Sequence, residues 1–333
     1  MRTEGIGGWR RRAWIAAVAA AALLPATARA ADVVVSNWGT NLFGVPYAVA
    51  LEKGFFKEAG APVTGAIGGG GGGSVVRNLL ANDLPFGEIA SSAAMDAQRE
   101  GLPLVIVAGT ARSFDNVWVA QPNSPVKAIK DLAGHSVAFT SPQSITEAFL
   151  LMVLNRNNID PASVKRVAAG GYAQGITLVD IGGVDVAPMA EPLKTIKRGK
   201  YREVFNAEDS LPPILSVVAV TTHDFAAKNP DKIRAILAAR RRGVDYIYEH
   251  PDEAARIMAA AYDMEPAIAS GAVDASVHTK QKLWSTGEID IAELTSIQQG
   301  MLLTGAKVGG TDWGKLIDIS YLPADLQAKS KMR

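Results

Sequence analysis

Short strand-like segments alternate with helix-like segments along most of this chain, and that order limits the fold more than any other feature. Residues 32–38, 86–90 and 104–108 are short, mainly apolar runs bounded by turn-forming residues, as expected of buried strands. Helical patterns lie between them, at 45–56 and from Ser74 onward. Strands that alternate with helices predict βαβ units and a mostly parallel sheet.

The same order begins again in the middle of the chain. Strands are predicted at 117–120, 136–139, 164–168 and 184–189. Ser144 and Glu147 have the S-x-x-E spacing of a capping box, in which the hydroxyl caps a backbone N–H and the carboxylate reaches back. The two halves therefore predict two similarly wound α/β lobes, each a mixed sheet flanked by helices.

The C-terminal third is predicted to be helical. Pro230 and Pro251 each stand at a first-turn position with acidic residues beside them, which is typical of a helix start. We expect these helices to pack back on the first lobe. Arg240, Arg241 and Arg242 lie in the middle of one of them and are interpreted as a solvated face.

The N-terminus has the features of a secretory signal. Arg10–Arg12 precede an apolar run at 13–24, and an A-x-A pattern ends at Ala30. A run of 12 residues is too short to span a bilayer, which needs about 20. We expect cleavage near Ala30 and a protein that is free in the periplasm without a membrane anchor. The paired arginines do not decide between general secretory export and twin-arginine export.

Charge and cysteine content exclude several function classes. Residues 1–30 hold five Arg and one Glu, which leaves 29 basic and 32 acidic residues afterwards, a net charge of −3. That balance does not suit a nucleic-acid-binding surface. The chain has no cysteine, so disulfides, thiol nucleophiles and a lipidated Cys are excluded. About 300 residues predict two domains.

Polar and aromatic residues near the predicted strand ends are the candidate ligand contacts. Open α/β sheets bind ligands at the carboxyl ends of their strands, and helix N-termini there favour anions or polar atoms. In the first half the candidates are Asn37, Trp38, Asn41, Phe43, Gly73, Ser74 and the cation Arg112. In the second half they are Ser141, Gln143, Ser144, Ile145 and Thr146.

Each candidate also has a plainer interpretation. Trp38 can pack in the lobe core, Ser144 and Thr146 can cap their own helix, and Arg112 can be a surface charge. The six glycines at 68–73 satisfy G-x-G-x-x-G only because they satisfy any glycine pattern, so a surface turn stays open.

Catalytic signatures do not appear in the sequence. There is no H-E-x-x-H, no G-x-S-x-G and no metal-spaced cluster among the four histidines. We therefore expect no enzymatic activity, no cofactor and no metal.

Several segments, in order, resemble the substrate-binding proteins of ABC importers for aliphatic sulfonates, taurine, nitrate and thiamine precursors. They are Lys53-Gly54-Phe55-Phe56, the run DLAGHSV at 131–137, Gly183-Val184-Asp185 with Glu191-Pro192, and the helix starts at Asn229 and His250. The resemblance implies the type II periplasmic binding protein fold, with two lobes joined by crossing strands near 114–120 and 215–221. It implies lobe 1 at 32–115 plus 217–333 and lobe 2 at 116–216.

The resemblance also implies the function and further site residues. It adds Ser91, Ser92, Tyr172 and Glu191 to the cleft. The expected function is capture of a small organic ligand, sulfonate- or carboxylate-like, by a monomer that delivers it to an ABC permease with its ATPase. The alternatives are a thiamine-pyrimidine synthase-like enzyme on the same fold and a periplasmic ligand sensor; the ligand stays open.

Overall fold

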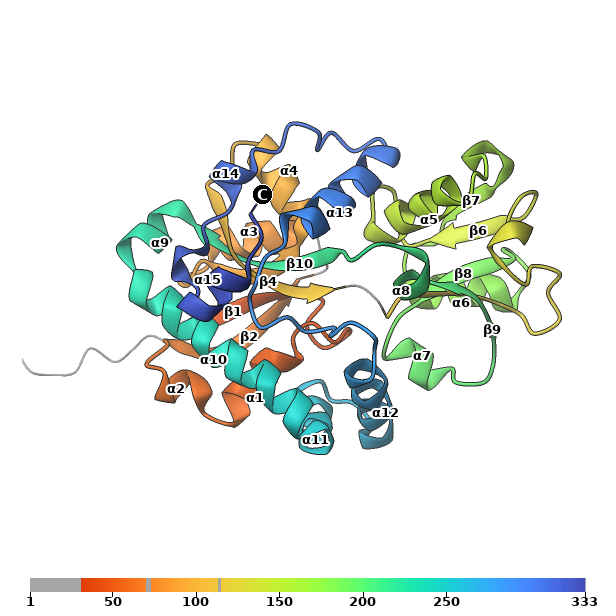
Figure 1. Ribbon diagram of the computed structural model, residues 1–333. Coiled ribbons are helices and arrows are strands. Elements are labelled where there is room, and N and C mark those ends of the chain that lie inside the picture. Colours follow the sequence, from red (N-terminus) through yellow and green to blue (C-terminus); the bar gives the residue numbers. More distant parts are fainter. Residues whose placement is uncertain (1–30, 70–72, 113–114, 333) are drawn as a thin grey trace, which may run out of the picture. The chain divides into compact units, whose positions relative to one another are not determined.

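The computed structural model describes residues 31–69, 73–112 and 115–332. The predicted signal at 1–30, the centre of the glycine run at 70–72 and Phe114 lie outside the described residues. Two five-stranded sheets form the frame, in the orders β2-β1-β3-β10-β4 and β7-β6-β8-β5-β9 (Figure 1). The first sheet with the helices packed on it is called lobe 1, and the second sheet with its helices is called lobe 2. The predicted two-lobed α/β fold is confirmed.

Lobe 1 combines parallel and antiparallel strands. Its strands are β1 (Ala31–Ser36), β2 (Val63–Gly69), β3 (Phe86–Ala90), β4 (Leu104–Arg112) and β10 (Leu215–Thr222). β1 pairs in parallel with β2 and β3, while β10 runs antiparallel between β3 and β4. Successive side chains of β1 point to opposite faces, so Val33 and Val35 enter one core and Val34 enters another.

Helices cover both faces of the first sheet (Figure 1). The core that holds Val33 also draws on α1 (Val45–Glu52), α2 (Phe55–Glu58), α10 (Pro230–Glu249), α11 (Pro251–Ala261) and α12 (Pro266–Val277). The core that holds Val34 draws on α3 (Gly73–Ala81), α4 (Ser91–Arg99) and α13 (Ile291–Leu303). The short helices α9 (His223–Lys228), α14 (Trp313–Leu316) and α15 (Ala324–Lys329) complete the lobe. The C-terminal third thus packs on lobe 1, as predicted.

Lobe 2 repeats the arrangement on a smaller scale. Its strands are β5 (Val117–Ala120), β6 (Ser136–Phe139), β7 (Lys165–Ala168), β8 (Val186–Met189) and β9 (Arg202–Asn206). Its helices are α5 (Ile145–Arg156), α6 (Tyr172–Asp180), α7 (Leu193–Ile196) and α8 (Ala207–Ser210). β6 pairs in parallel with β7 and β8, and β5 lies antiparallel between β8 and β9. Trp118 stacks on Phe205 with ring centroids 4.7 Å apart, which fixes β5 against β9.

The predicted crossing segments coincide with two strands of the structure, β5 and β10. β5 and β10 are each an inner strand of one sheet rather than a strand shared by both lobes. The chain therefore changes sheet before β5 and again before β10.

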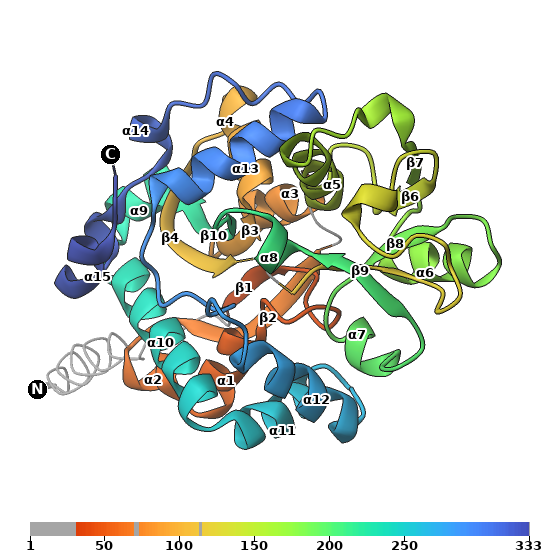
Figure 2. The same cartoon turned by 45° about the vertical axis from the view of Figure 1, so that its right-hand side comes forward.

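The lobes also touch through helices on two flanks. α13 contacts α5, where Gly300 lies against Met152, and one apolar core runs through both helices. α12 contacts α7, where Gly271 lies against Thr195. Both helix pairs lie side by side in two views (Figures 1 and 2). No helix within the described residues is long and apolar enough to cross a membrane.

Arg240 corrects the interpretation of the arginine run as a solvated face. Its side chain is buried, and its Nε lies 3.1 Å from Glu88 Oε2 on β3. It also donates to the backbone oxygens of Ser285 at 2.7 Å and Thr110 at 2.8 Å. Arg240 falls on the buried stripe of α10 that includes Ile236 and Val244, whereas its neighbours Arg241 and Arg242 point away from the core.

Candidate ligand-binding site

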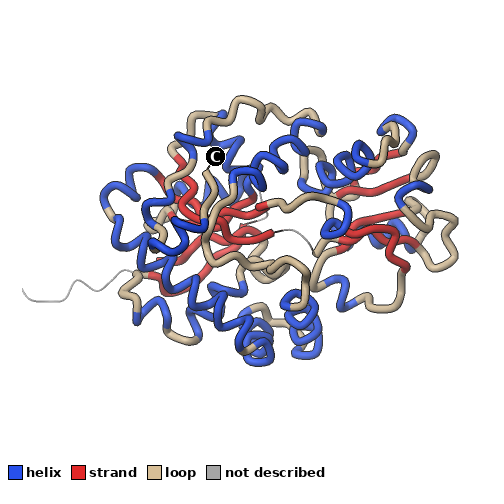
Figure 3. Tube along the Cα trace, in the orientation of Figure 1, coloured by secondary structure: helices blue, strands red, loops and turns tan. Residues whose placement is uncertain are grey.

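Loops lie between the two groups of strands (Figure 3). The carboxyl ends of the parallel strands β1, β3, β6 and β8 each lead into a loop or a helix start. Ligands of open α/β sheets bind at this edge. Most of the candidate residues follow these strands, so they lie at this edge of their own sheets.

The loop after β1 is ordered by its own polar groups. Asn37 adopts a positive φ of 55°, which Asn tolerates better than most residues, and its N–H donates to Gly69 O at 2.9 Å. Asn41 Oδ1 accepts from the Phe43 N–H at 3.1 Å. Asn41 therefore shapes the loop, while the exposed Asn37 side chain stays available to a ligand.

Trp38 is partly buried and packs edge to face on Tyr262, with ring centroids 5.1 Å apart. Phe43 is also partly buried and packs against the same core. The plainer interpretation of Trp38 as a core residue is thus correct for one part of the ring only, because the rest of the ring is accessible.

The described glycines of the run make close contacts. Gly69 ends β2, and a Cβ there would lie 2.7 Å from Val75 Cγ2 on α3. Gly73 begins α3, and Ser74 follows in its first turn. Only glycine fits at position 69, because β2 and α3 approach each other so closely there. Gly69 is therefore not part of a simple surface turn.

Two candidates of lobe 1 already form hydrogen bonds or ion pairs with other residues of the protein. Ser91 is buried and donates to Leu215 O at 2.6 Å, whereas Ser92, the next residue of α4, is partly buried. Arg112 donates from Nε to both carboxylate oxygens of Glu293 at 3.0 and 3.1 Å, and its Nη1 lies 3.5 Å from Glu288. Two carboxylates balance this cation, so we leave Ser91 and Arg112 out of the proposed site.

The loop between β6 and α5 carries the second group of candidates. Ser144 caps α5, because its Oγ accepts from the Glu147 N–H at 3.3 Å. Glu147 departs from the predicted capping box: it accepts from the Gln143 N–H at 2.7 Å and pairs with Arg166 at 3.0 Å. Thr146 Oγ1 accepts from the Thr140 N–H at 2.9 Å.

Accessibility in this loop differs from residue to residue. Ser141 and Gln143 are exposed, Ser144 and Ile145 are partly buried, and Thr146 is buried. A ligand at the start of α5 can therefore reach Ser141, Gln143 and the rim of Ser144, while Thr146 supports the loop from below.

A buried polar cluster lies where the chain enters lobe 2. The Tyr172 hydroxyl donates to Asn116 Oδ1 at 2.7 Å, and the Glu191 N–H donates to Asp115 Oδ2 at 3.1 Å. Asp115, Asn116 and Glu191 are buried. Lys194 lies 3.8 Å from Glu191 Oε1. The cluster joins the predicted Tyr172 and Glu191 to two residues that sequence reasoning missed, since an Asp-Asn pair before a strand matches no motif.

Burial raises the pKa of Asp115 and of Glu191. A carboxyl group whose folded-state pKa is raised favours the folded state below its unfolded pKa, near pH 4, and this contribution is lost as the pH rises through the folded pKa. Asp115→Asn keeps an acceptor for the Glu191 N–H and removes the buried charge. We expect a higher Tm than that of the parent at pH 7, with the difference shrinking towards pH 4.

Thermal unfolding at both pH values tests this prediction. Glu52→Gln, at an exposed position that forms no ion pair within the described residues, is the control and should leave Tm unchanged at both. A Tm below that of the parent at pH 7, or a difference that grows on acidification, contradicts it.

The site offers hydrogen-bond donors, acceptors, helix N-termini and aromatic surface. Within residues 31–69, 73–112 and 115–332, no group of three or more His, Asp or Glu residues is arranged to hold a metal ion. The arrangement suits reversible binding of an organic molecule.

Solved structures similar to this chain include periplasmic binding proteins, so the chain has the periplasmic binding protein fold. The structure is similar to the aliphatic sulphonate binding protein SsuA from Escherichia coli (TM-score 0.71, 17% identity, 87% of this chain and 92% of that chain). It is also similar to the alkanesulfonate-binding protein SsuA from Xanthomonas axonopodis pv. citri bound to MOPS (TM-score 0.66, 13% identity, 86% and 98%).

Sequence comparison then places the chain more narrowly. The model of the NMT1/THI5-like family matches residues 44–254, so the chain belongs to this family. Its sequence is 25% identical over 234 residues to the riboflavin-binding protein RibY of Chloroflexus aurantiacus, covering 64% of this chain. The match spans 61% of that relative's length.

Proposed function

We propose that this protein is the periplasmic solute-binding component of an ABC importer, which captures a small organic molecule between its lobes and delivers it to a permease and its ATPase. One observation carries the proposal: accessible polar side chains follow the carboxyl ends of strands in both lobes. A ligand that contacts both sets favours the closed arrangement by its differential affinity. In this proposal residues 32–115 with 217–333 move as one lobe and 116–216 as the other.

The contacts that we assign to the ligand come from both lobes. Lobe 1 contributes Asn37, Phe43 and Ser92 with the start of α3, and lobe 2 contributes Ser141, Gln143 and Ser144. Tyr172 and Glu191 line the inner end. An anionic group, such as a sulfonate or carboxylate, would rest on the N-termini of α5 and α6 rather than on Arg112, whose charge Glu288 and Glu293 balance.

Binding rather than catalysis is supported by the composition of the chain and by the structures that it resembles. The chain contains no cysteine to act as a nucleophile. Its structural neighbours in the family's fold include further binding proteins, such as the nitrate-binding protein NrtA from Synechocystis PCC 6803 (TM-score 0.54, 17% identity, 72% of this chain and 68% of that chain). The predicted signal at 1–30 supports action in the periplasm.

A thermal-shift screen tests the proposal. We expect one compound among riboflavin, alkanesulfonates, aromatic acids, nitrate and pyrimidines to raise Tm. A ligand at a hundredfold excess over Kd stabilises the folded state by about 2.7 kcal/mol. Ser144→Ala should weaken that binding, and Ala267→Phe on an exposed turn of α12 is the control. A screen in which none of the compounds moves Tm contradicts the proposal.

A further inference from the structure

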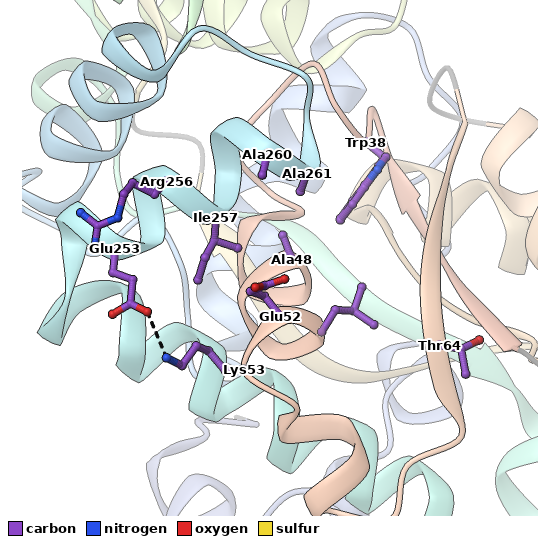
Figure 4. A pocket seen from close by; sticks show the side chains of 11 residues that line it. Trp38, Ala48, Glu52, Lys53, Thr64, Glu253, Arg256, Ile257, Ala260 and Ala261 are labelled. Carbon is purple, nitrogen blue, oxygen red and sulfur yellow. Dashed lines mark hydrogen bonds and ion pairs between the residues drawn. The ribbon is translucent and has the colours of Figure 1, made fainter.

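A pocket of about 690 Å³ lies in lobe 1 between α1, α11 and β2 (Figure 4). No residue of lobe 2 lines it, so it is separate from the proposed cleft. Its volume falls within the usual range for small-molecule sites, about 300–1,000 Å³. Figure 4 shows Trp38 at one end, Arg256 and Glu253 at the other, and Ala48 and Ile257 between them.

The Trp38 end is apolar and held in place. A Cβ at Gly44 would lie 2.6 Å from the Trp38 ring, and one at Gly68 would lie 3.3 Å from its Cβ, so the backbone closes on both sides of this residue. The edge-to-face contact with Tyr262 leaves part of the indole facing the pocket. An aromatic or branched apolar group packs well on such a fixed ring.

Two opposite charges along the pocket remain available: Glu52 lies beside Ala48 in its middle, and Arg256 lies at the end opposite Trp38 (Figure 4). Lys53 and Glu253 pair with each other at 3.0 Å, and the Tyr246 hydroxyl also donates to Glu253. Glu52 and Arg256 are exposed, and neither forms an ion pair with another residue in the described part of the chain. A ligand that carries both an ammonium and a carboxylate would meet both of these side chains.

We propose that this pocket is a second binding site, for a small zwitterion with an apolar side chain such as an aromatic amino acid. The side chain rests on Trp38 and the small residues of α11, the carboxylate faces Arg256 and the ammonium faces Glu52. The site is complete in lobe 1, so it does not depend on closure of the lobes.

Tryptophan signals report binding at this place. Residues 31–333 form one compact unit and contain Trp38, Trp118, Trp284 and Trp313. In protein labelled with ¹⁵N-tryptophan, L-phenylalanine should move the Trp38 indole N–H signal saturably, with a Kd of about 1 mM or tighter. The buried Trp118 and Trp284 serve as internal references, and Trp38→Phe identifies the signal. Phenylacetate should bind more weakly and phenethylamine more weakly still.

Matched variants locate the probe. Ala261→Phe fills the pocket from an exposed position and should abolish the shift, whereas Ala267→Phe, outside the pocket, should leave it unchanged. Arg256→Gln should weaken L-phenylalanine by about tenfold or more and leave phenethylamine unaffected. An unmoved Trp38 signal, equal binding by the two Phe variants, or loss of binding in Ser144→Ala would overturn the proposal, the last by placing the probe in the cleft.

Discussion

Replacing Arg240 by methionine is expected to lower the free energy of unfolding by about 3–5 kcal/mol, the usual cost of removing one partner of a buried ion pair. Arg240 is 1% exposed and Glu88 is fully buried, so the variant leaves a carboxylate without its cation. It also leaves the Ser285 and Thr110 oxygens without their donor. These bonds tie α10 to β3, to β4 and to the segment before α13, so the loss affects all of lobe 1.

The adjacent arginine is the matched control. Arg241 pairs with Asp325 at 2.7 Å on the surface, and Arg241→Met should cost about 1 kcal/mol or less. Urea unfolding curves measure both variants. Adding Glu88→Gln to Arg240→Met should recover part of the stability, because the unpaired charge is removed. Equal losses in Arg240→Met and Arg241→Met would contradict the account.

Local signals in the sequence predict the elements well. β3, β5 and β6 occupy the predicted residues because each is a short apolar run with turn-forming residues at its ends. The helices that begin at Pro230 and Pro251, and the Ser144 cap, are likewise present, since each depends on neighbours in the chain.

Long-range pairing explains what the sequence could not show. Arg240 and Glu88 are 152 residues apart, and Arg112 and Glu293 are 181 apart. Nothing near either arginine distinguishes a buried pair from a solvated charge or a ligand contact. Gly243 is another case: a Cβ there would lie 2.3 Å from Pro46 O, which shows how closely α10 approaches α1.

The residues of the interlobe site also fall into two groups, those that local sequence signals indicate and those that depend on long-range contacts. The position of the candidates at strand ends follows from the alternation of strands and helices, so Asn37 and Ser141 could be selected from the sequence, whereas Tyr172 came from the family resemblance. Asp115 and Asn116 could not, because their importance comes from contacts with Glu191 and Tyr172 across the sheet.

A disulfide across the lobes offers the second large effect. A Cβ at Gly271 on α12 would lie 2.7 Å from Thr195 Cγ2 and 3.4 Å from its Oγ1 on α7, close enough for a disulfide between cysteines at these positions. Because the chain has no other cysteine, Gly271→Cys/Thr195→Cys forms one defined link. Oxidation then holds α12 against α7, and the cleft cannot open on that flank.

Ligand binding by this double-cysteine protein, measured oxidised and reduced, tests capture between the lobes most directly. The ligand is the compound with the largest shift in the screen, and the two single-cysteine variants, with their thiols alkylated, are the controls. Protein oxidised empty should bind at least about a hundredfold more weakly than reduced protein, a difference of about 2.7 kcal/mol. Protein oxidised with ligand present should keep it through dialysis until reduced. Equal affinity in the empty oxidised and reduced proteins would contradict capture between the lobes.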